Sequence, residues 1–128
     1  MSIINAIASV AVRDLSSAIK WYEAVLRKAP SKPMSEVAEW GFERGGWLQV
    51  YQLPERAGSG SFTLAVSNLE EEVAHLKKLN IDTGQRTSGE KVKTLMITDP
   101  DGNHVALAET SDPSLLDESL RYGLNVAR

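Results

Sequence analysis

The sequence predicts an α+β fold in which paired βαβββ modules form a curved mixed sheet with a concave cleft. Three observations support this prediction. Residues 10–26 and 64–79 repeat one pattern, namely a short alternating strand, an Asp or Asn, and an amphipathic helix. Further alternating segments follow each helix, and turn residues separate them. Along these segments, bulky apolar side chains fall on one strand face, whereas small or polar side chains fall on the other.

The repeat extends through the first strand and the helix of each module. Asp14 and Asn68 are typical helix N-cap residues and hold the same place in the two copies. Apolar side chains then recur with the spacing of one helical face. In the first helix they are Leu15, Ile19, Tyr22 and Leu26, and in the second they are Leu69, Val73, Leu76 and Leu79.

A hairpin is expected after each helix. Strands over 37–43 and 47–53 are joined by the turn ERGG, and strands over 92–98 and 104–108 are joined by DPDGN. In the second turn, Pro100 presets φ, Asp99 can accept hydrogen bonds from the backbone, and Gly102 tolerates positive φ. A shorter strand is expected before each hairpin, near residues 32–35 and 84–87.

These elements predict a single domain, residues 1–128, made of module 1–54 and module 60–110. The Gly- and Ser-rich stretch PERAGSGS, residues 54–61, is expected to be the loop between the modules. A C-terminal helix over about 112–122 is expected, because Asp and Pro stand at its start and apolar residues follow with helical spacing.

Composition narrows the class of protein. The 128 residues include no Cys, which excludes disulfides, thiolate catalysis and Cys-based zinc sites. The net charge of −3 argues against nucleic-acid binding. No apolar run approaches the roughly 20 residues of a membrane span, and the N-terminus lacks the basic region of a signal peptide. The expected location is the cytoplasm, with no membrane partner.

The two strand faces have different compositions. The bulky face should lie beneath the helices, whereas the other face should line the cleft, since it is too small and polar to fill a dry core. The expected core face carries Val10, Val12, Leu48, Val50, Phe62, Leu64, Val66, Val105 and Leu107. The expected cleft face carries Ile7, Ser9, Ala11, Trp47, Gln49, Tyr51, Ser61, Thr63, Ala65, His104, Ala106 and Ala108.

The stretches VAVRDLSSAIKWYEAVL and ITDPDGNHVALAE, together with the doubled module, resemble the vicinal oxygen chelate superfamily. That superfamily includes glyoxalase I, extradiol dioxygenases, fosfomycin-resistance enzymes and bleomycin-resistance proteins. The resemblance covers about residues 5–110 and is specific for the fold. It does not fix an activity, because one fold can serve several chemistries.

The resemblance also implies where a metal would be bound. Members that use a metal place His, Glu or Gln side chains at four equivalent strand positions, which fall at Ile7, Gln49, Ser61 and Ala106 in this sequence. Ile and Ala have no donor atoms, and a neutral Ser hydroxyl is a poor ligand for a divalent ion. We therefore expect no metal and no other cofactor.

The leading functional prediction is that a homodimer binds a small molecule without a metal and so sequesters a drug or metabolite. The resemblance implies ligands like those of bleomycin-resistance proteins, which are cationic and aromatic. Trp40, Trp47 and Tyr51 could contact such a ligand by stacking and cation–π interaction. The expected ligand-binding residues are Trp47, Gln49, Tyr51, Ser61, Thr63, Met96 and His104.

Two other classes of function remain open. The protein could be an enzyme, either through Glu39 acting as a base without a metal or as a lyase, isomerase or dioxygenase with a divergent site. Glu39 is expected opposite Gln49 on the same strand face if ERGG forms the turn. The protein could also be an interaction domain that retains the fold alone.

Overall fold

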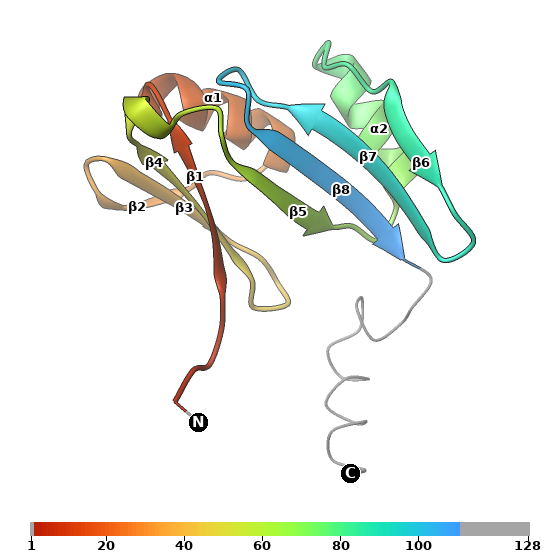
Figure 1. Ribbon diagram of the computed structural model, residues 1–128, viewed down its shortest axis with the longest axis horizontal. Coiled ribbons are helices and arrows are strands. Elements are labelled where there is room, and N and C mark those ends of the chain that lie inside the picture. The colour runs from red at the N-terminus through yellow and green to blue at the C-terminus, as the bar shows by residue number, and fades with distance from the viewer. Residues whose placement is uncertain (1, 111–128) are drawn as a thin grey trace. The chain divides into compact units, whose positions relative to one another are not determined.

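The computed structural model describes residues 2–110, and the predicted helix over about 112–122 lies outside them. The described residues form two compact units, of which the first runs to Phe62 and also contains Thr98–Val105, whereas the second contains Thr63–Ile97 and residues 106–110. Each unit has a helix and a four-stranded sheet (Figure 1). The α+β class and the paired βαβββ modules are therefore confirmed.

The elements follow one another as the repeat predicts. The first module contains β1 (Ile7–Val12), α1 (Leu15–Leu26), β2 (Ser31–Met34), β3 (Val37–Gly41) and β4 (Trp47–Gln52). The second contains β5 (Ser61–Ala65), α2 (Leu69–Lys78), β6 (Gln85–Ser88), β7 (Val92–Thr98) and β8 (His104–Thr110). A short 3₁₀ helix, η1 (Pro54–Arg56), occupies the start of the predicted loop.

The first sheet has the strand order β1-β4-β3-β2 and is mixed. The outer strand β1 runs parallel to β4, with Ile7 opposite Trp47 and Ser9 opposite Gln49. The hairpin partner β3 runs antiparallel to β4, with Glu39 opposite Gln49. This pairing confirms the prediction that Glu39 and Gln49 are cross-strand neighbours on one face.

Helix α1 begins at the predicted cap. The carboxylate of Asp14 accepts hydrogen bonds from the Ser17 backbone N–H at 3.0 Å and from the Ser17 hydroxyl at 2.7 Å. These bonds satisfy a helix N-terminal donor that has no partner within the helix, and they hold the pKa of Asp14 below its usual value. The helix ends at Arg27, which adopts a left-handed φ of 58°.

The buried face of α1 differs from the expected one. Ile19 and Leu26, which the spacing predicts on the core face, are only half-buried. Ala18 and Val25 are buried in their place, so the buried face is rotated by about one residue. Ala18 is a small apolar residue, which counting large apolar side chains does not detect. The buried residues of α1 are Leu15, Ala18, Tyr22 and Val25.

The second unit carries the sheet with the order β5-β8-β7-β6. Helix α2 begins at Asn68, whose side chain accepts from the Glu71 backbone N–H at 3.1 Å, as the sequence predicts. Three acidic residues follow in the first turn, where the helix dipole favours negative charge. Its buried residues are Leu69, Val73 and Leu76.

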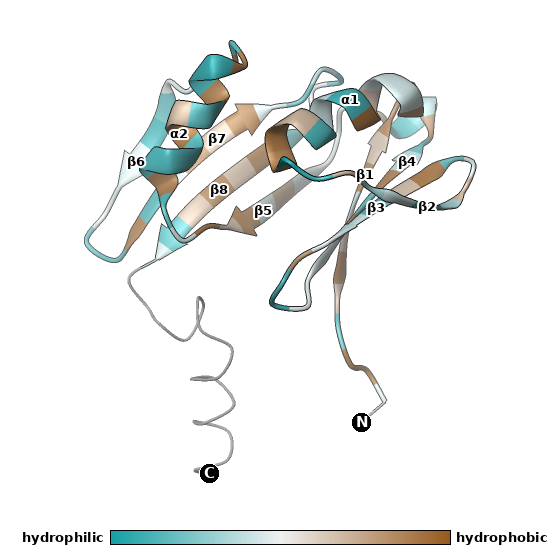
Figure 2. Ribbon diagram, turned by 180° about the vertical axis from the view of Figure 1, so that it is seen from behind, coloured by the Kyte–Doolittle hydropathy of each residue, from teal (hydrophilic) through white to brown (hydrophobic). Residues whose placement is uncertain are grey.

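The predicted core face is largely confirmed. Of its nine members, Leu64 and Val66 are half-buried and the others are buried. Hydrophobic and hydrophilic residues alternate along the helices and strands of each unit (Figure 2). Among residues 2–110, no helix is long and apolar enough to cross a membrane.

Candidate ligand-binding site

The face of the first sheet that carries Gln49 presents polar and aromatic side chains in rows across the strands. A polar row contains Ser9, Gln49 and Glu39, which are cross-strand neighbours. The Gln49 amide nitrogen donates to Glu39 Oε2 at 2.9 Å, and Ser9 Oγ donates to Gln49 Oε1 at 3.4 Å. These two bonds fix the orientation of the Gln49 amide. The second carboxylate oxygen of Glu39 has no hydrogen-bond partner within residues 2–110, so it can accept from a ligand.

An aromatic side chain lies beside this polar row. Trp47 pairs with Gly41 across the β3–β4 hairpin, and its indole lies against the Gly41 backbone. A Cβ atom built on Gly41 would come within 2.9 Å of Cη2 and Cζ2 of Trp47. Trp47 is nevertheless 42% exposed, so the other face of the ring is open to a ligand. The third row places Tyr51 between Ala11 and Val37.

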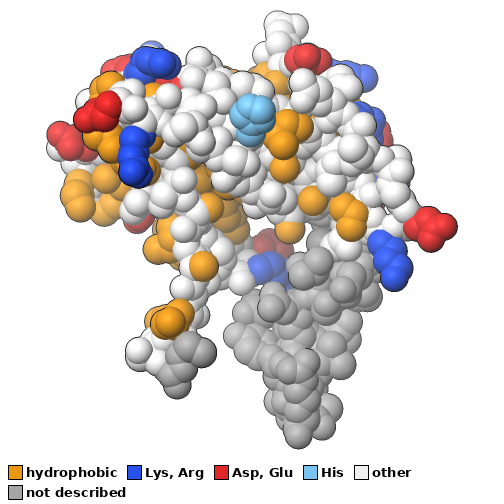
Figure 3. All heavy atoms as spheres, in the orientation of Figure 1, with side chains coloured by type: hydrophobic (Ala, Val, Ile, Leu, Met, Phe, Trp, Pro, Cys, Tyr) orange, Lys and Arg blue, Asp and Glu red, His pale blue; other side chains and the backbone are white. Residues whose placement is uncertain are grey.

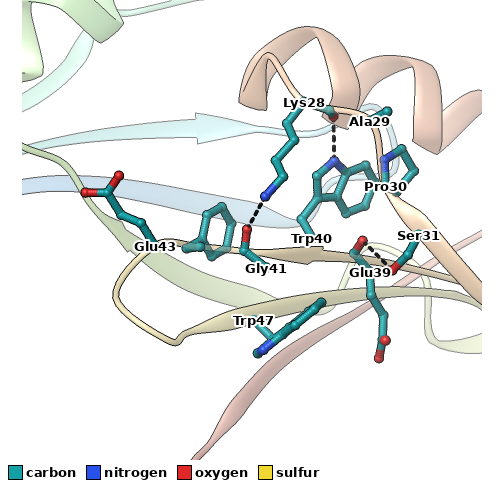
Figure 4. A pocket seen from close by; sticks show the side chains of 10 residues that line it. Lys28, Ala29, Pro30, Ser31, Glu39, Trp40, Gly41, Glu43 and Trp47 are labelled. Carbon is teal, nitrogen blue, oxygen red and sulfur yellow. Dashed lines mark hydrogen bonds between the residues drawn. The ribbon is translucent and has the colours of Figure 1, made fainter.

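A pocket of about 560 Å³ opens at the edge of β3 (Figure 4). Lys28 and Trp40 lie on the α1 side of β3, whereas Trp47 and the Glu39 carboxylate lie on the opposite side. The pocket therefore reaches around the strand edge, and its volume is within the ordinary range for small-molecule sites. Its lining residues are Lys28, Ala29, Pro30, Ser31, Glu39, Trp40, Gly41, Phe42, Glu43 and Trp47.

The expectation that Trp40 stacks on a ligand is wrong. Trp40 is 1% exposed, and its Nε1 donates to the Lys28 backbone carbonyl at 2.7 Å. Its ring packs against that of Tyr22, with the ring centroids 5.9 Å apart. The alternation of β3 explains this placement, because Glu39 faces the polar row and the next residue must face the core.

The remaining predicted ligand contacts are divided between the two units. Ser61 and His104 lie in the first unit and are exposed. Thr63, which is exposed, and Met96, which is half-buried, lie in the second. Their meeting with Trp47 in one cleft stays a prediction.

The residues at the superfamily's metal positions do not fit a divalent ion. Ile7 and Ala106 offer no donor atom, Ser61 offers only a hydroxyl, and the Gln49 amide is occupied by Glu39 and Ser9. Within the described part of the chain, no three His, Asp or Glu side chains come together as a group that could hold a metal.

Sequence reasoning missed a buried polar network in the first unit. Asp99 is 4% exposed, and its Oδ2 accepts from the Tyr22 hydroxyl and from Asn103 Nδ2, each at 2.8 Å. Asn103 Nδ2 also donates to the Ala11 carbonyl at 2.9 Å, and Asn103 Oδ1 accepts from Gly60 N–H at 2.8 Å. The predicted backbone bonds of Asp99 are present as well, from Asp101 N–H and Asn103 N–H.

This network has an electrostatic effect on Tyr22. Burial, followed by the negative charge of Asp99, raises the pKa of the Tyr22 hydroxyl above its usual value of 10.0. The hydroxyl therefore stays protonated and donates to the carboxylate. The network fastens the DPDGN turn to β1 and α1, which is a structural role. In the sequence, Tyr22 on the apolar face of the first helix and Asp99 at the start of the DPDGN turn were the signals for this network.

The first unit also exposes several large hydrophobic side chains. Exposed large hydrophobic side chains include Met34 at 65%, Ile7 at 54% and Trp47 at 42%. In Figure 3, hydrophobic side chains gather over the region of β2, β3 and β4 and along the N-terminal segment. An apolar surface of this kind is typical of a binding surface.

No protein-family model matches this chain, and no curated protein matches it either. Solved structures do match, and they define the fold as that of the vicinal oxygen chelate superfamily. One is a glyoxalase/bleomycin resistance protein from Catenulispora acidiphila DSM 44928. It is 29% identical, with a TM-score of 0.75 over 84% of this chain and 99% of that chain.

Two further structures share the fold at lower identity. An antibiotic-binding protein from Streptomyces sp. CB03234 is 21% identical, with a TM-score of 0.73 over 87% of this chain and 99% of that one. A lactoylglutathione lyase from Agrobacterium tumefaciens is 17% identical, with a TM-score of 0.69 over 85% of this chain and 94% of that one. The superfamily resemblance of the sequence is thus confirmed for the fold.

Proposed function

We propose that this protein binds a small, planar, cationic organic molecule without a metal, on the face of the first sheet that carries Trp47, Gln49 and Tyr51. The observation that carries the proposal is the position of an open indole face beside a carboxylate that has a free oxygen. Trp47 provides the ring, and Glu39 provides the charge. Such molecules include drugs, and binding without turnover would sequester them.

The geometry supports this ligand class in two ways. Trp47 is packed against Gly41 on one side, so little conformational freedom is lost when a ligand covers its other side. A cation within about 6 Å of an indole face is attracted by the ring, and a nearby carboxylate adds a direct charge interaction. Gln49 holds one oxygen of Glu39 in place, which orients the other.

The similar structures support small-molecule binding in general. One carries bleomycin resistance in its description, and another is described as an antibiotic-binding protein. The other predicted contacts remain part of the proposed contact set: Ser61 and His104 in the same unit as Trp47, and Thr63 and Met96 in the second unit.

A glyoxalase-like reaction is the second candidate, because a lactoylglutathione lyase shares the fold. The side chains at the four metal positions offer too few donors for a metal-bound reaction. An enzymatic version of the site would therefore depend on Glu39 acting as a base. Loss of turnover in Glu39→Gln, with binding of a neutral substrate retained, is the result that would favour catalysis over sequestration.

The experiment uses three planar probes of similar size and different charge. They are 9-aminoacridine, which is cationic near neutral pH, neutral anthracene-9-methanol, and anionic acridine-9-carboxylate. Thermal melting and two-dimensional NMR should show that the cation binds best and shifts the Trp47 indole N–H signal. Equal binding of all three probes, or shifts confined to residues away from the first sheet, would contradict the proposal.

We also propose that the chain forms a homodimer. The superfamily resemblance implies dimers, and the first unit exposes Ile3, Ile4 and Ile7, of which Ile7 lies opposite Trp47 on the neighbouring strand. Burial of these side chains against a second copy would remove them from water, which is favourable by about 25 cal/mol per Å² of apolar surface.

A further inference from the structure

We propose a second binding site at the open edge of β3, where the Gly41 N–H and the Lys28 ammonium together bind the carboxylate of a small organic acid. This site uses the α1 side and the edge of β3, and its ligand has the opposite charge to the one proposed above. It does not depend on the proposed function of the Trp47 face.

The backbone of Gly41 faces outward from the sheet. The neighbouring Phe42 N–H donates to the Gly46 carbonyl at 2.9 Å, so the backbone N–H of Phe42 points toward the β4 side of the hairpin. Successive residues of a strand direct their backbone groups to opposite sides, and Gly41 must therefore point away from β4. Strand β2 runs antiparallel to β3 and begins at Ser31, which lies opposite Glu39. No residue of β2 therefore lies opposite Gly41.

The Gly41 N–H is consequently a donor without a hydrogen-bond partner among residues 2–110. Its carbonyl confirms the direction, because it accepts from Lys28 Nζ at 2.7 Å (Figure 4). A backbone donor at a strand edge normally bonds to water or to an added group. In this protein it opens into a pocket of about 560 Å³.

Lys28 is held in place at two points. Its backbone carbonyl accepts from Trp40 Nε1 at 2.7 Å, and its ammonium donates to the Gly41 carbonyl at the same distance. An ammonium has three N–H donors, so two remain for a ligand. The positive charge and the Gly41 N–H thus lie at the same edge of the strand, where a carboxylate can accept from both.

The walls of the pocket define the rest of the ligand. Pro30 and Phe42 are apolar and can contact a small hydrocarbon or aromatic body. Glu39 and Glu43 also line the pocket and oppose additional negative charge. The Glu43 side chain is 89% exposed, so solvent screens most of its repulsion. The site therefore favours an apolar monocarboxylate over a dicarboxylate or a phosphate.

Phenylacetate is a suitable probe, with phenylacetamide and 2-phenylethylamine as uncharged and cationic counterparts. In amide NMR, phenylacetate should shift the Gly41 N–H and the Trp40 indole N–H, whereas the two counterparts should leave them in place. Equal shifts with 2-phenylethylamine would overturn the proposal. An unchanged Gly41 amide signal at the highest soluble concentration of phenylacetate would overturn it as well. This comparison needs no variant and decides the question even if a variant does not fold.

Two matched variants test the role of the charge. Lys28→Met keeps the length of the side chain but removes the ammonium, and should raise the Kd for phenylacetate by roughly tenfold or more. Lys32→Met removes an exposed lysine from neighbouring β2 and should leave the Kd unchanged. Equal affinity in the two variants would contradict the assignment of Lys28. Binding of 9-aminoacridine should persist in both, which separates this site from the Trp47 face.

Discussion

Gly41 lies directly against the indole of Trp47, and no side chain larger than hydrogen fits between them. A Cβ atom on Gly41 would stand 2.9 Å from two ring carbons of Trp47, closer than carbon atoms approach in folded proteins. The indole is exposed on its other face, so it can move when it is pushed. Gly41 therefore sets the position of the ring on which the proposed ligand stacks.

Gly41→Ala should displace the Trp47 ring and cost about 0.5–1.5 kcal/mol of stability, the usual cost of a side chain forced from its rotamer. The Trp47 indole signal should move in NMR spectra, and binding of 9-aminoacridine should weaken. Gly46→Ala is the matched control, because a Cβ at Gly46 meets nothing within 4 Å. Identical spectra for Gly41→Ala and the parent protein would show that the ring does not depend on Gly41.

Trp47→Ala and Val50→Ala should have opposite effects, since the two residues lie on opposite faces of β4. Loss of Trp47 should weaken probe binding by roughly 1–3 kcal/mol and change stability little. Loss of two methyl groups from fully buried Val50 should lower the free energy of unfolding by about 1.6 kcal/mol or more, with little effect on binding. Titration measures the probe affinity of both variants, and thermal melting measures their stability. A large loss of stability in Trp47→Ala without a loss of binding would reverse the assignment of the faces.

Tyr22→Phe should destabilise the first unit by about 1–3 kcal/mol, because buried Asp99 loses a hydrogen-bond donor. The variant should also alter the response to alkaline pH. In the parent protein, the Tyr22 pKa is raised by folding, so its contribution to stability is complete below the unfolded value of 10.0 and falls as pH rises above it.

Denaturant melts between neutral and strongly alkaline pH test this linkage. The parent protein should lose stability above about pH 10 more steeply than Tyr22→Phe does. Tyr51→Phe, which removes a phenol hydroxyl from a half-buried ring without touching Asp99, is the matched variant for comparison. Parallel curves for the parent and Tyr22→Phe would mean that the Tyr22 hydroxyl ionises as readily in the folded protein as in the unfolded chain.

Purified protein should contain no stoichiometric transition metal, because Ile7 and Ala106 supply no donors at two of the four superfamily positions. Elemental analysis after dialysis should give far less than one metal ion per chain, and a chelator should leave probe binding intact. About one Ni, Zn, Fe or Mn per chain, with binding lost on chelation, would refute the prediction.

Light scattering should give a mass of about twice the 14.0 kDa of the chain at tens of micromolar. If exposed Ile4 and Ile7 belong to the interface, then Ile4→Asp together with Ile7→Asp should shift the protein toward the monomer, because charges would be buried. A monomer mass for the parent protein would contradict the proposed homodimer.

The elements of the fold could be predicted because each depends on local signals. Asp14 and Asn68 mark the helix starts, and the alternation of Val10 and Val12 marks β1. Both signals depend only on residues that are neighbours in the sequence. The turn ERGG sets the register of the hairpin and correctly placed Glu39 opposite Gln49. Alternation along the strand is likewise a local signal. Applied consistently, it would also have placed Trp40 in the core, since Trp40 follows Glu39 on the strand.

Other features depend on contacts between distant residues and could not be predicted in this way. The bond between Tyr22 and Asp99 joins residues far apart in the chain, and no local pattern shows that this tyrosine points at this carboxylate. The contact of Trp47 with Gly41 depends on the exact register of a hairpin and on a side-chain rotamer. The open N–H of Gly41 appears only once β2 is seen to begin at Ser31.

The two repeats of this chain are not separable pieces. The turn that holds Asp99 and Asn103 lies late in the sequence, yet its buried partners Tyr22 and Ala11 belong to the first repeat. The first repeat expressed without the second lacks these bonds and leaves the buried Tyr22 hydroxyl without its Asp99 partner. Expression of either repeat alone should therefore yield a poorly folded fragment, whereas mixing the two fragments should restore the structure by rejoining the turn to Tyr22.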